Sequence, residues 1–281
     1  MTSEEALRVP PEALGSGTSI RVQVLSDVGD VIHEFARIML NEIKRNNAAG
    51  KKSVFIIPVG PVGQYPILAR WCNAERVSCA NVVMINMDEY CTDGGDLIPY
   101  ENPLSFRRHM DLHFYSLLDP QLTVQSENRV FPDPKRPEAI AETIAAVGGV
   151  DVCFAGIGIT GHVAFNDPPE PGEKVSSDEF ERLPTRVVSL SRESALVNAI
   201  ASSRGNWYSI PRKAVTVGMR EILDARKIRV FMVREWQSAV ARLFIHGPVT
   251  PSVPASFLQK HPDVEVVMTK AVATSPEPSL G

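Results

Sequence analysis

Apolar and polar positions change along this chain in blocks, as they do where helices and strands follow one another. Between residues 28 and 46, apolar side chains recur at helical spacing. The next apolar run, 53–58, is short, rich in β-branched and aromatic residues, preceded by two lysines and ended by a proline. The pattern therefore predicts a helix followed by a buried strand.

The same alternation continues through the rest of the chain. Predicted helices cover residues 64–72, 105–118, 137–147 and 235–244. Predicted strands cover residues 81–87, 150–155, 185–190, 227–233 and 264–268. Strands that are apolar on both faces and separated by helices are typical of a mostly parallel sheet with helices on both faces. We therefore predict a doubly wound, Rossmann-like α/β fold, which binds ligands beyond the carboxyl ends of its strands.

Composition narrows the class of protein. With 281 residues, 44% of them hydrophobic and 22% charged, the chain can form one globular domain over 1–281, with flexible ends at about 1–18 and 271–281. A net charge of −4 provides no broad positive field for nucleic acid. The start of the chain lacks a leader pattern and no apolar stretch is long enough to span a bilayer, so we expect a cytoplasmic protein without membrane contact.

Two loops have the composition of a ligand-binding site. The segments DEYCTDGG at 88–95 and GIGITGHVAFNDPP at 156–169 each follow an apolar strand, so the fold should bring them together. Residues 168–184 form a long, charged and proline-rich segment, for which a mobile lid and a plain surface excursion are both open interpretations.

Glycines at 156, 158 and 161 superficially match a dinucleotide-binding fingerprint. That fingerprint opens a helix and is followed by an acidic residue about 20 positions later; here two prolines and a long loop intervene. Gly156, Gly158 and Gly161 instead allow the backbone to pack closely around a small ligand. The sequence therefore argues against a nicotinamide cofactor.

One histidine with an orienting carboxylate, and a pair of adjacent carboxylates, are the candidates for proton transfer. His162 lies in the glycine-flanked loop, and Asp167 follows five positions later as an orienting partner. Asp88 and Glu89 directly follow a buried strand, where partial burial raises a carboxyl pKa and makes an effective base for a proton on carbon. A helix cap or a turn residue is the alternative interpretation of this pair.

Candidate anion-binding groups occur at the start of the strand predicted over 185–190, after Ile210-Pro211, and in the loop after the first predicted strand. Arg186 and Arg212 carry guanidinium groups that can bind phosphate at two points. The loop PVGPVG at 58–63, which includes Gly60 and Gly63, can offer backbone N–H groups and a helix N-terminus. A metal site is not expected, because the pair His109 and His113 lacks a third ligand.

Two segments together resemble the signature motifs of the glucosamine-6-phosphate deaminase/isomerase family. They are NMDEY at 86–90 and GITGHVAFNDP at 158–168. Further similarity occurs in TR at 185–186, IPRKAVTVG at 210–218, LDA at 223–225 and SFLQKHP at 256–262, so that the resemblance extends from about residue 28 to 272.

The resemblance implies an aldose-to-ketose isomerisation with loss of ammonia, without metal or organic cofactor. By the same resemblance, Asp88 is the base that moves a proton from C2 to C1, His162 helps to open the sugar ring, and Asp167 supports that histidine. Arg186 and Arg212 match basic positions that bind the substrate phosphate in the family. Thr160 stands where well-characterised members carry an Asp beside the catalytic histidine.

Three functions remain open from the sequence. The first is deamination of glucosamine 6-phosphate or a close relative, and the second is a non-deaminating isomerase or lactonase of the same fold. The third is a catalytically inactive sugar-phosphate sensor, motivated by Thr160 and by Val59 and Val62, which replace hydroxyl side chains of the family's phosphate loop. A homo-oligomer is compatible with each of them.

Overall fold

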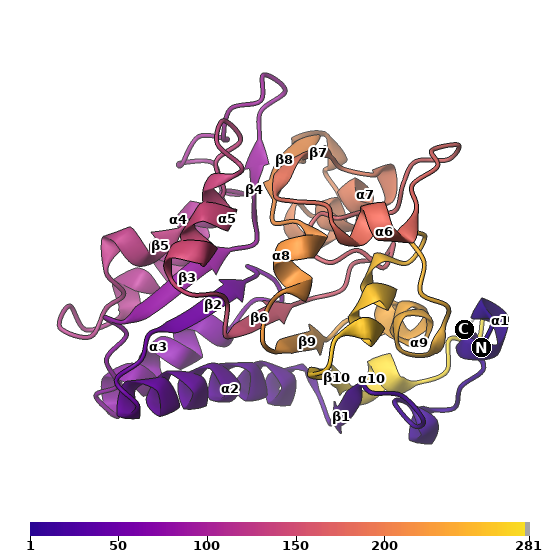
Figure 1. Ribbon diagram of the computed structural model, residues 1–281, viewed down its shortest axis with the longest axis horizontal. Helices are drawn as coiled ribbons and strands as arrows, with labels where there is room; N and C mark the ends of the chain where they lie inside the picture. Colours follow the sequence, from indigo (N-terminus) through magenta and orange to yellow (C-terminus); the bar gives the residue numbers. More distant parts are fainter. Residues whose placement is uncertain (279–281) are drawn as a thin grey trace.

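A seven-stranded parallel sheet forms the centre of the computed structural model, which describes residues 1–278 (Figure 1). Its strands are β1 (Arg21–Leu25), β2 (Ser53–Ile57), β3 (Val82–Asn86), β5 (Arg129–Val130), β6 (Val152–Ala155), β9 (Ile228–Met232) and β10 (Val264–Thr269). They lie in the order β1-β10-β9-β6-β2-β3-β5, and every neighbouring pair is parallel.

The strand order reverses direction beside β2. The chain adds β3 and then β5 on one side of β2, and later places β6, β9 and β10 on the other side. Loops that leave β2 and β6 therefore turn away from each other and open a crevice at the carboxyl edge of the sheet. The order of the strands alone thus locates a ligand site between these two loops.

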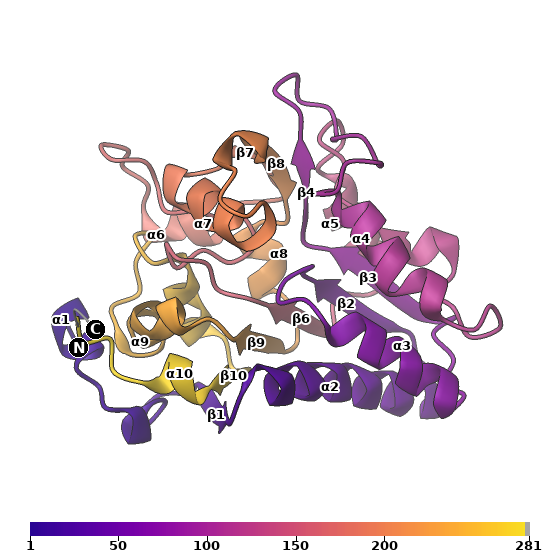
Figure 2. The ribbon, with the colours of Figure 1, turned by 180° about the vertical axis from the view of Figure 1, so that it is seen from behind.

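Helices cover both faces of the sheet, as predicted for a doubly wound fold. One face packs against α2 (Val28–Ala48), α3 (Gln64–Ala74) and α4 (Phe106–His113). The other face packs against α5 (Ala139–Ala146), α8 (Met219–Leu223), α9 (Ser238–His246) and α10 (Lys270–Ala273). Seen from behind, α2 runs along the base of the molecule, with α3 beside it (Figure 2).

Strand β2 shows why the sheet is buried on both faces. Its five residues are all buried; Val54 and Ile56 belong to one hydrophobic core, and Phe55 and Ile57 belong to the other. This alternation follows from the two-residue period of a strand. The ring of Phe35 in α2 stacks on that of Phe231 in β9, with 3.9 Å between the ring centroids. The helix predicted over 28–46 is therefore confirmed, with its apolar side packed on the sheet.

A second, antiparallel sheet stands above the first in Figure 1. It consists of β4 (Asp88–Cys91), β8 (Lys213–Thr216) and β7 (Arg186–Ser189), in that order. The prediction of a loop over 88–95 was wrong for its first half, because residues 88–91 form β4. Two adjacent carboxylates made this run appear solvated, whereas all four residues are buried by tertiary packing.

Other boundaries also differ from the predicted ones. The helix predicted over 105–118 ends at His113 and is followed by a 3₁₀ turn, Tyr115–Leu117. The helix predicted over 235–244 begins as a 3₁₀ turn, Glu235–Gln237, before α9. Helices α6 (Ser177–Glu181) and α7 (Arg192–Ser202) and strands β1 and β8 were not predicted.

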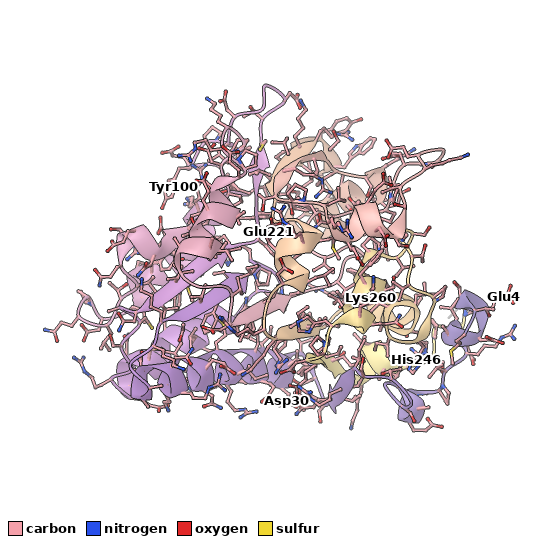
Figure 3. All side chains as sticks on the ribbon, in the orientation of Figure 1. Glu4, Asp30, Tyr100, Glu221, His246 and Lys260 are labelled. Atoms are coloured by element: carbon pink, nitrogen blue, oxygen red, sulfur yellow. The ribbon has the colours of Figure 1, made fainter. Side chains whose placement is uncertain are left out.

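Short helices occur near both ends of the chain. Helix α1 (Ser3–Leu7) packs on α9, and α10 follows β10 directly. His246 of α9, labelled in Figure 3, accepts a hydrogen bond at Nε2 from the backbone N–H of Gly15 at 3.0 Å.

The predicted flexibility of 1–18 and 271–281 stays a prediction, and residues 279–281 lie outside the described residues. Within residues 1–278, no helix combines the length and apolar character needed to cross a bilayer.

Candidate active site

A cavity of about 290 Å³ opens at the predicted crevice. Its wall is formed by the segments that follow β2, β3, β6 and β9, together with one side of α7. The lining residues are Pro58, Val59, Gly60, Pro61, Val62, Met87, Asp88, Tyr90, Phe106, Gly156, Ile157, Gly158, His162, Ala164, Phe165, Asn198, Ala201, Ser202, Phe231, Val233, Arg234 and Gln237. The two loops singled out in the sequence therefore meet, and Asp88 and His162 share one cavity.

Asp88 is the first residue of β4 and only 8% exposed. Burial raises the pKa of its carboxyl group to about 8, with a smaller contribution from the negative charge of Glu89. A carboxyl group with this pKa gains and loses a proton near neutral pH, which suits a general base. The predicted role of Asp88 therefore has a suitable environment.

Glu89 does not line the cavity, although the sequence placed it at the site. It is fully buried and accepts hydrogen bonds from the backbone N–H groups of Phe106 (3.1 Å) and Arg107 (3.0 Å) in the first turn of α4. Ser105 Oγ and Arg107 Nε also donate to it, each at 3.1 Å. Ser105 is the N-cap of α4, and Glu89 of β4 accepts further N–H groups of its first turn. Glu89 points away from Asp88 because adjacent residues of a strand point to opposite faces.

His162 lies against Gly158, and the position of its ring requires glycine there. A Cβ atom at position 158 would come within 2.0 Å of the imidazole ring, so only glycine leaves room for it. His162 Nδ1 lies 2.8 Å from Asp167 Oδ1. With Nδ1 engaged by a carboxylate, Nε2 is the nitrogen left to exchange a proton with a ligand.

The carboxylate of Asp167 accepts four hydrogen bonds, one of them from His162. Thr160 Oγ1 and Ser194 Oγ donate to Oδ1 at 2.7 Å each, beside His162, and the backbone N–H of Ser191 donates to Oδ2 at 3.1 Å. Burial by itself raises the pKa of this carboxyl group, but the hydrogen bond and charge of His162, with the two hydroxyl donors, hold the pKa well below its ordinary value. Asp167 thus stays ionised and orients the imidazole.

Thr160 takes part through this network and does not line the cavity. Ser194 was missed by sequence reasoning, since a serine in an unpredicted helix carries no signal of its own. Its position on α7 brings it to both His162 Nδ1 (3.0 Å) and Asp167. Helix α7 also contributes Asn198, which donates to the Tyr90 hydroxyl at 3.0 Å in the cavity wall.

The two arginines predicted to bind phosphate lie outside the cavity lining. Arg186 of β7 is separated from Asp88 by Thr216 of β8, and its Nη1 donates to Asn166 Oδ1 at 2.7 Å. Burial lowers the pKa of Arg186. Arg212 lies over the ring of Trp207, with its guanidinium carbon 5.5 Å from the ring centroid.

The predicted glycines divide into two groups. Gly60, Gly156 and Gly158 line the cavity, so the backbone approaches a ligand closely there. Gly63 is the N-cap of α3, with φ 115° and no side-chain cap. Gly161 turns the histidine loop with φ 82°, a region that favours glycine.

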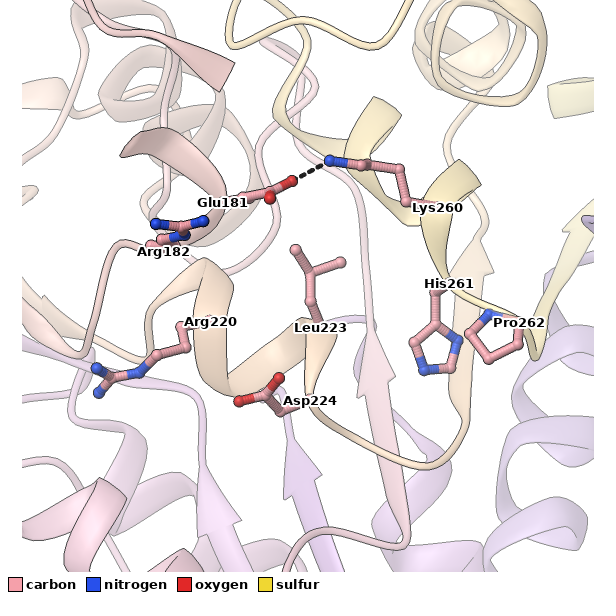
Figure 4. A pocket seen from close by; sticks show the side chains of 8 residues that line it. All are labelled: Glu181, Arg182, Arg220, Leu223, Asp224, Lys260, His261 and Pro262. Carbon is pink, nitrogen blue, oxygen red and sulfur yellow. Dashed lines mark hydrogen bonds and ion pairs between the residues drawn. The ribbon is translucent and has the colours of Figure 1, made fainter. Parts of the chain in front are cut away.

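A second cavity, of about 310 Å³, is lined by none of the candidate catalytic or phosphate-binding residues predicted from the sequence (Figure 4). Lys260 and Glu181 form an ion pair across it, and Arg220 and Asp224 lie on its opposite side. Across residues 1–278, no group of three His, Cys, Asp or Glu side chains is placed to hold a metal ion. The proton-transfer groups therefore select the first cavity as the candidate site.

Known proteins with similar sequences include glucosamine-6-phosphate deaminases. The chain is 30% identical over 263 residues to a glucosamine-6-phosphate deaminase of Shewanella loihica, covering 91% of this chain and 89% of that protein. A protein of the same name from Rhodopirellula baltica is 29% identical over 269 residues, with 93% and 98% covered. No family model matches the sequence.

Solved structures show the same fold. A monomeric glucosamine-6-phosphate deaminase superposes with a TM-score of 0.76 at 24% identity, covering 90% of this chain and 98% of that one. The 6-phosphogluconolactonase of Thermotoga maritima has a TM-score of 0.64 at 14% identity, with 89% and 100% covered. At these identities the likeness concerns the fold alone.

Proposed function

The chain belongs to the glucosamine-6-phosphate deaminase family, and we propose that it converts glucosamine 6-phosphate, or a close relative, to a fructose 6-phosphate type ketose and ammonia. The observation that carries this proposal is the convergence of Asp88 and His162 in one cavity at the switch point of the sheet. A base for a C–H proton and a proton carrier for ring oxygens are the two groups that the reaction requires.

His162 is the group proposed to open the sugar ring. Its Nε2 takes the proton of the anomeric hydroxyl, and the imidazolium returns a proton to the ring oxygen as the ring bond breaks. Asp167 stabilises the imidazolium, because the carboxylate is ionised and lies 2.8 Å from Nδ1. Thr160 and Ser194 hold that carboxylate in place.

Asp88 is the group proposed to carry out the isomerisation. Its carboxylate removes the proton from C2, and the electron pair forms a C1–C2 double bond. The aldehyde oxygen takes a proton from the substrate ammonium and becomes a hydroxyl, which leaves a neutral amino group on C2. The same carboxyl group then delivers the proton to C1, leaving a C2 imine. Water adds to C2 and ammonia leaves, so one water is consumed and no electron carrier is needed. A substrate ammonium beside Asp88 favours its ionised form.

The oligomeric state stays open. A glucosamine-6-phosphate deaminase with a similar fold is monomeric, and a homo-oligomer is also compatible with the cavity described above. The four cysteines are free and buried, which fits a reducing compartment, and we propose the cytoplasm as the location.

Ammonia release from 6-phosphorylated amino sugars, without added metal, tests the proposal. We expect release with one sugar of the panel, and a loss of about 10² to 10⁴-fold in Asp88→Asn and in His162→Ala. Both variants should keep the far-UV circular dichroism of the parent. Hydrolysis of 6-phosphogluconolactone without ammonia release would support the lactonase alternative instead. Saturable sugar-phosphate binding without turnover would support the sensor.

A further inference from the structure

Cations that reach the cavity are scarce. Among the described residues that line it, Arg234 is the one lysine or arginine, whereas Arg186 and Arg212 face other partners. Arg234 lies two residues after the end of β9 and is exposed. Its guanidinium makes no ion pair within the part of the chain that the structure describes. A charge left without a protein counter-ion at a ligand cavity can bind an anionic ligand.

The backbone of Arg234 is held by Gln237. The Oε1 atom of Gln237 accepts the N–H groups of Val233 and Arg234, each at 2.8 Å. Its Nε2 atom donates to the carbonyl of Ile157, in the loop after β6, at 2.7 Å. Gln237 is buried, so this link between the two loops is protected from water. The backbone of Arg234 is therefore held at a fixed position on the rim of the cavity.

Strand order places Arg234 at the far end of the cavity from Asp88. Asp88 follows β3 and Arg234 follows β9, and the order β9-β6-β2-β3 separates these strands by three spacings, roughly 14 Å. His162, which follows β6, lies between them. In an opened six-carbon sugar phosphate, C1 and C2 are likewise at the opposite end from the phosphate on C6. The extended arginine side chain and the extended ligand can together cover this span.

The loop after β2 provides few side-chain donors for a phosphate. Between β2 and α3 it presents Val59, Pro61 and Val62 to the cavity, none of which carries a hydroxyl or a charge. Because this loop brings no charged side chain to the cavity, a bound phosphate depends on a residue outside the loop for charge neutralisation. We propose that Arg234 binds the phosphate group of the substrate, in place of Arg186 and Arg212. This inference rests on the proposed function for the identity of the ligand.

Kinetics of Arg234→Ala with a phosphorylated and an unphosphorylated amino sugar test this role. For the phosphorylated substrate we expect kcat/KM to fall by about 10- to 100-fold, mostly through KM, because a charge-assisted contact is lost. For the unphosphorylated sugar kcat/KM should not change. Arg234→Lys should recover part of the loss. The matched control is Arg70→Ala, which removes the same charge from an exposed position of α3 outside the cavity.

An equal fall for both sugars would overturn the proposal, and so would an unchanged KM for the phosphorylated one. Calorimetric titration with inorganic phosphate distinguishes a failure of the Arg234 phosphate site from a failure of the deaminase assignment. Phosphate binding that is lost in Arg234→Ala and kept in Arg70→Ala supports the site even if no ammonia is released. Equal phosphate binding by both variants and the parent contradicts it.

Discussion

At the scale of single residues, the chemistry of Asp88 depends on the absence of a counter-charge. Burial and the neighbouring Glu89 both disfavour its ionised form. Asp167 has the opposite environment, because an imidazole and two hydroxyls donate to one of its oxygens. Two carboxyl groups of one site are therefore held in different protonation states, one able to move a proton and the other fixed as an anion.

The pH profile should reveal the raised pKa of Asp88. A base must be unprotonated to accept the C2 proton, so kcat/KM should rise with pH and level off above about 8. Glu89→Gln removes one cause of the raised pKa, and the midpoint should move to lower pH. Steady-state rates between pH 5.5 and 9.5 measure both effects. A rate that is constant between pH 6 and 9 would show that Asp88 is not the limiting base.

Thr160 and Ser194 donate hydroxyl hydrogen bonds to Asp167, and by the family resemblance Thr160 stands where well-characterised members carry an Asp. Ser194→Ala and Thr160→Val should each lower kcat by about 10-fold, with little change in KM, because each removes one hydrogen bond to a charged group. The double variant should lose more than either single one. Ser189→Ala, an exposed serine of β7, is the control. A matching loss of kcat in the control would argue against a positioning role.

At the scale of secondary-structure elements, β4 connects the site to α4. Asp88 faces the cavity, and the next residue, Glu89, caps the first turn of α4 through two backbone N–H groups and the Arg107 side chain. Asp88 thus lies on a strand whose next residue, Glu89, is fixed by an ion pair with a fully buried carboxylate and a partly exposed Arg107 guanidinium. This arrangement explains why an acidic pair occurs in a fully buried strand.

Removing the cap should unfold the protein more readily. Glu89→Ala leaves the Arg107 guanidinium and two N–H groups without their acceptor, at a cost of about 3 to 5 kcal/mol in the free energy of unfolding. Glu89→Gln should cost less, because an amide oxygen still accepts. Urea unfolding measures the difference, with Glu101→Ala, an exposed carboxylate nearby, as the control. A loss below 1 kcal/mol would contradict the structural role.

Periodicity predicted the elements of the main sheet far better than those of the small one. Strands such as β2 and β9 are buried throughout and apolar except for Ser53 and Arg229, so local sequence and tertiary burial largely agree. Strand β4 carries two acids, and β1 is a partly exposed edge strand; neither pattern is distinct from that of a loop. Helix α7 has a weak apolar stripe because its buried side includes Ser194.

At the scale of the whole molecule, the switch point of the sheet decides where the site lies. Alternating elements predicted a doubly wound fold, and the rule for such folds brought Asp88 and His162 together. Arg234 and Ser194 could not be found in this way, because their roles depend on which side chains fill the cavity wall after folding. Sequence spacing contains no information on that packing.

The ends of the chain meet at Arg242, a fully buried arginine of α9. Its Nε donates to the carbonyl of Val9 at 2.8 Å, and its Nη2 donates to the carbonyl of Ala273 at 2.7 Å. Nη1 donates to the carbonyl of Thr274 at 3.0 Å. The Arg242 side chain thus connects the segment before β1 to the segment after β10. It lies outside the active site, so its role is structural.

Arg242→Ala should therefore loosen both ends at once. The substitution leaves buried carbonyls without donors and creates a cavity, which should lower the free energy of unfolding by about 3 kcal/mol or more. Hydrogen exchange should accelerate in residues 3–9 and 270–274 together, while β2 and β6 stay protected until global unfolding. Arg70→Ala controls for charge. If only one end exchanged faster, the two segments would be held independently, and Arg242 would not be the link between them.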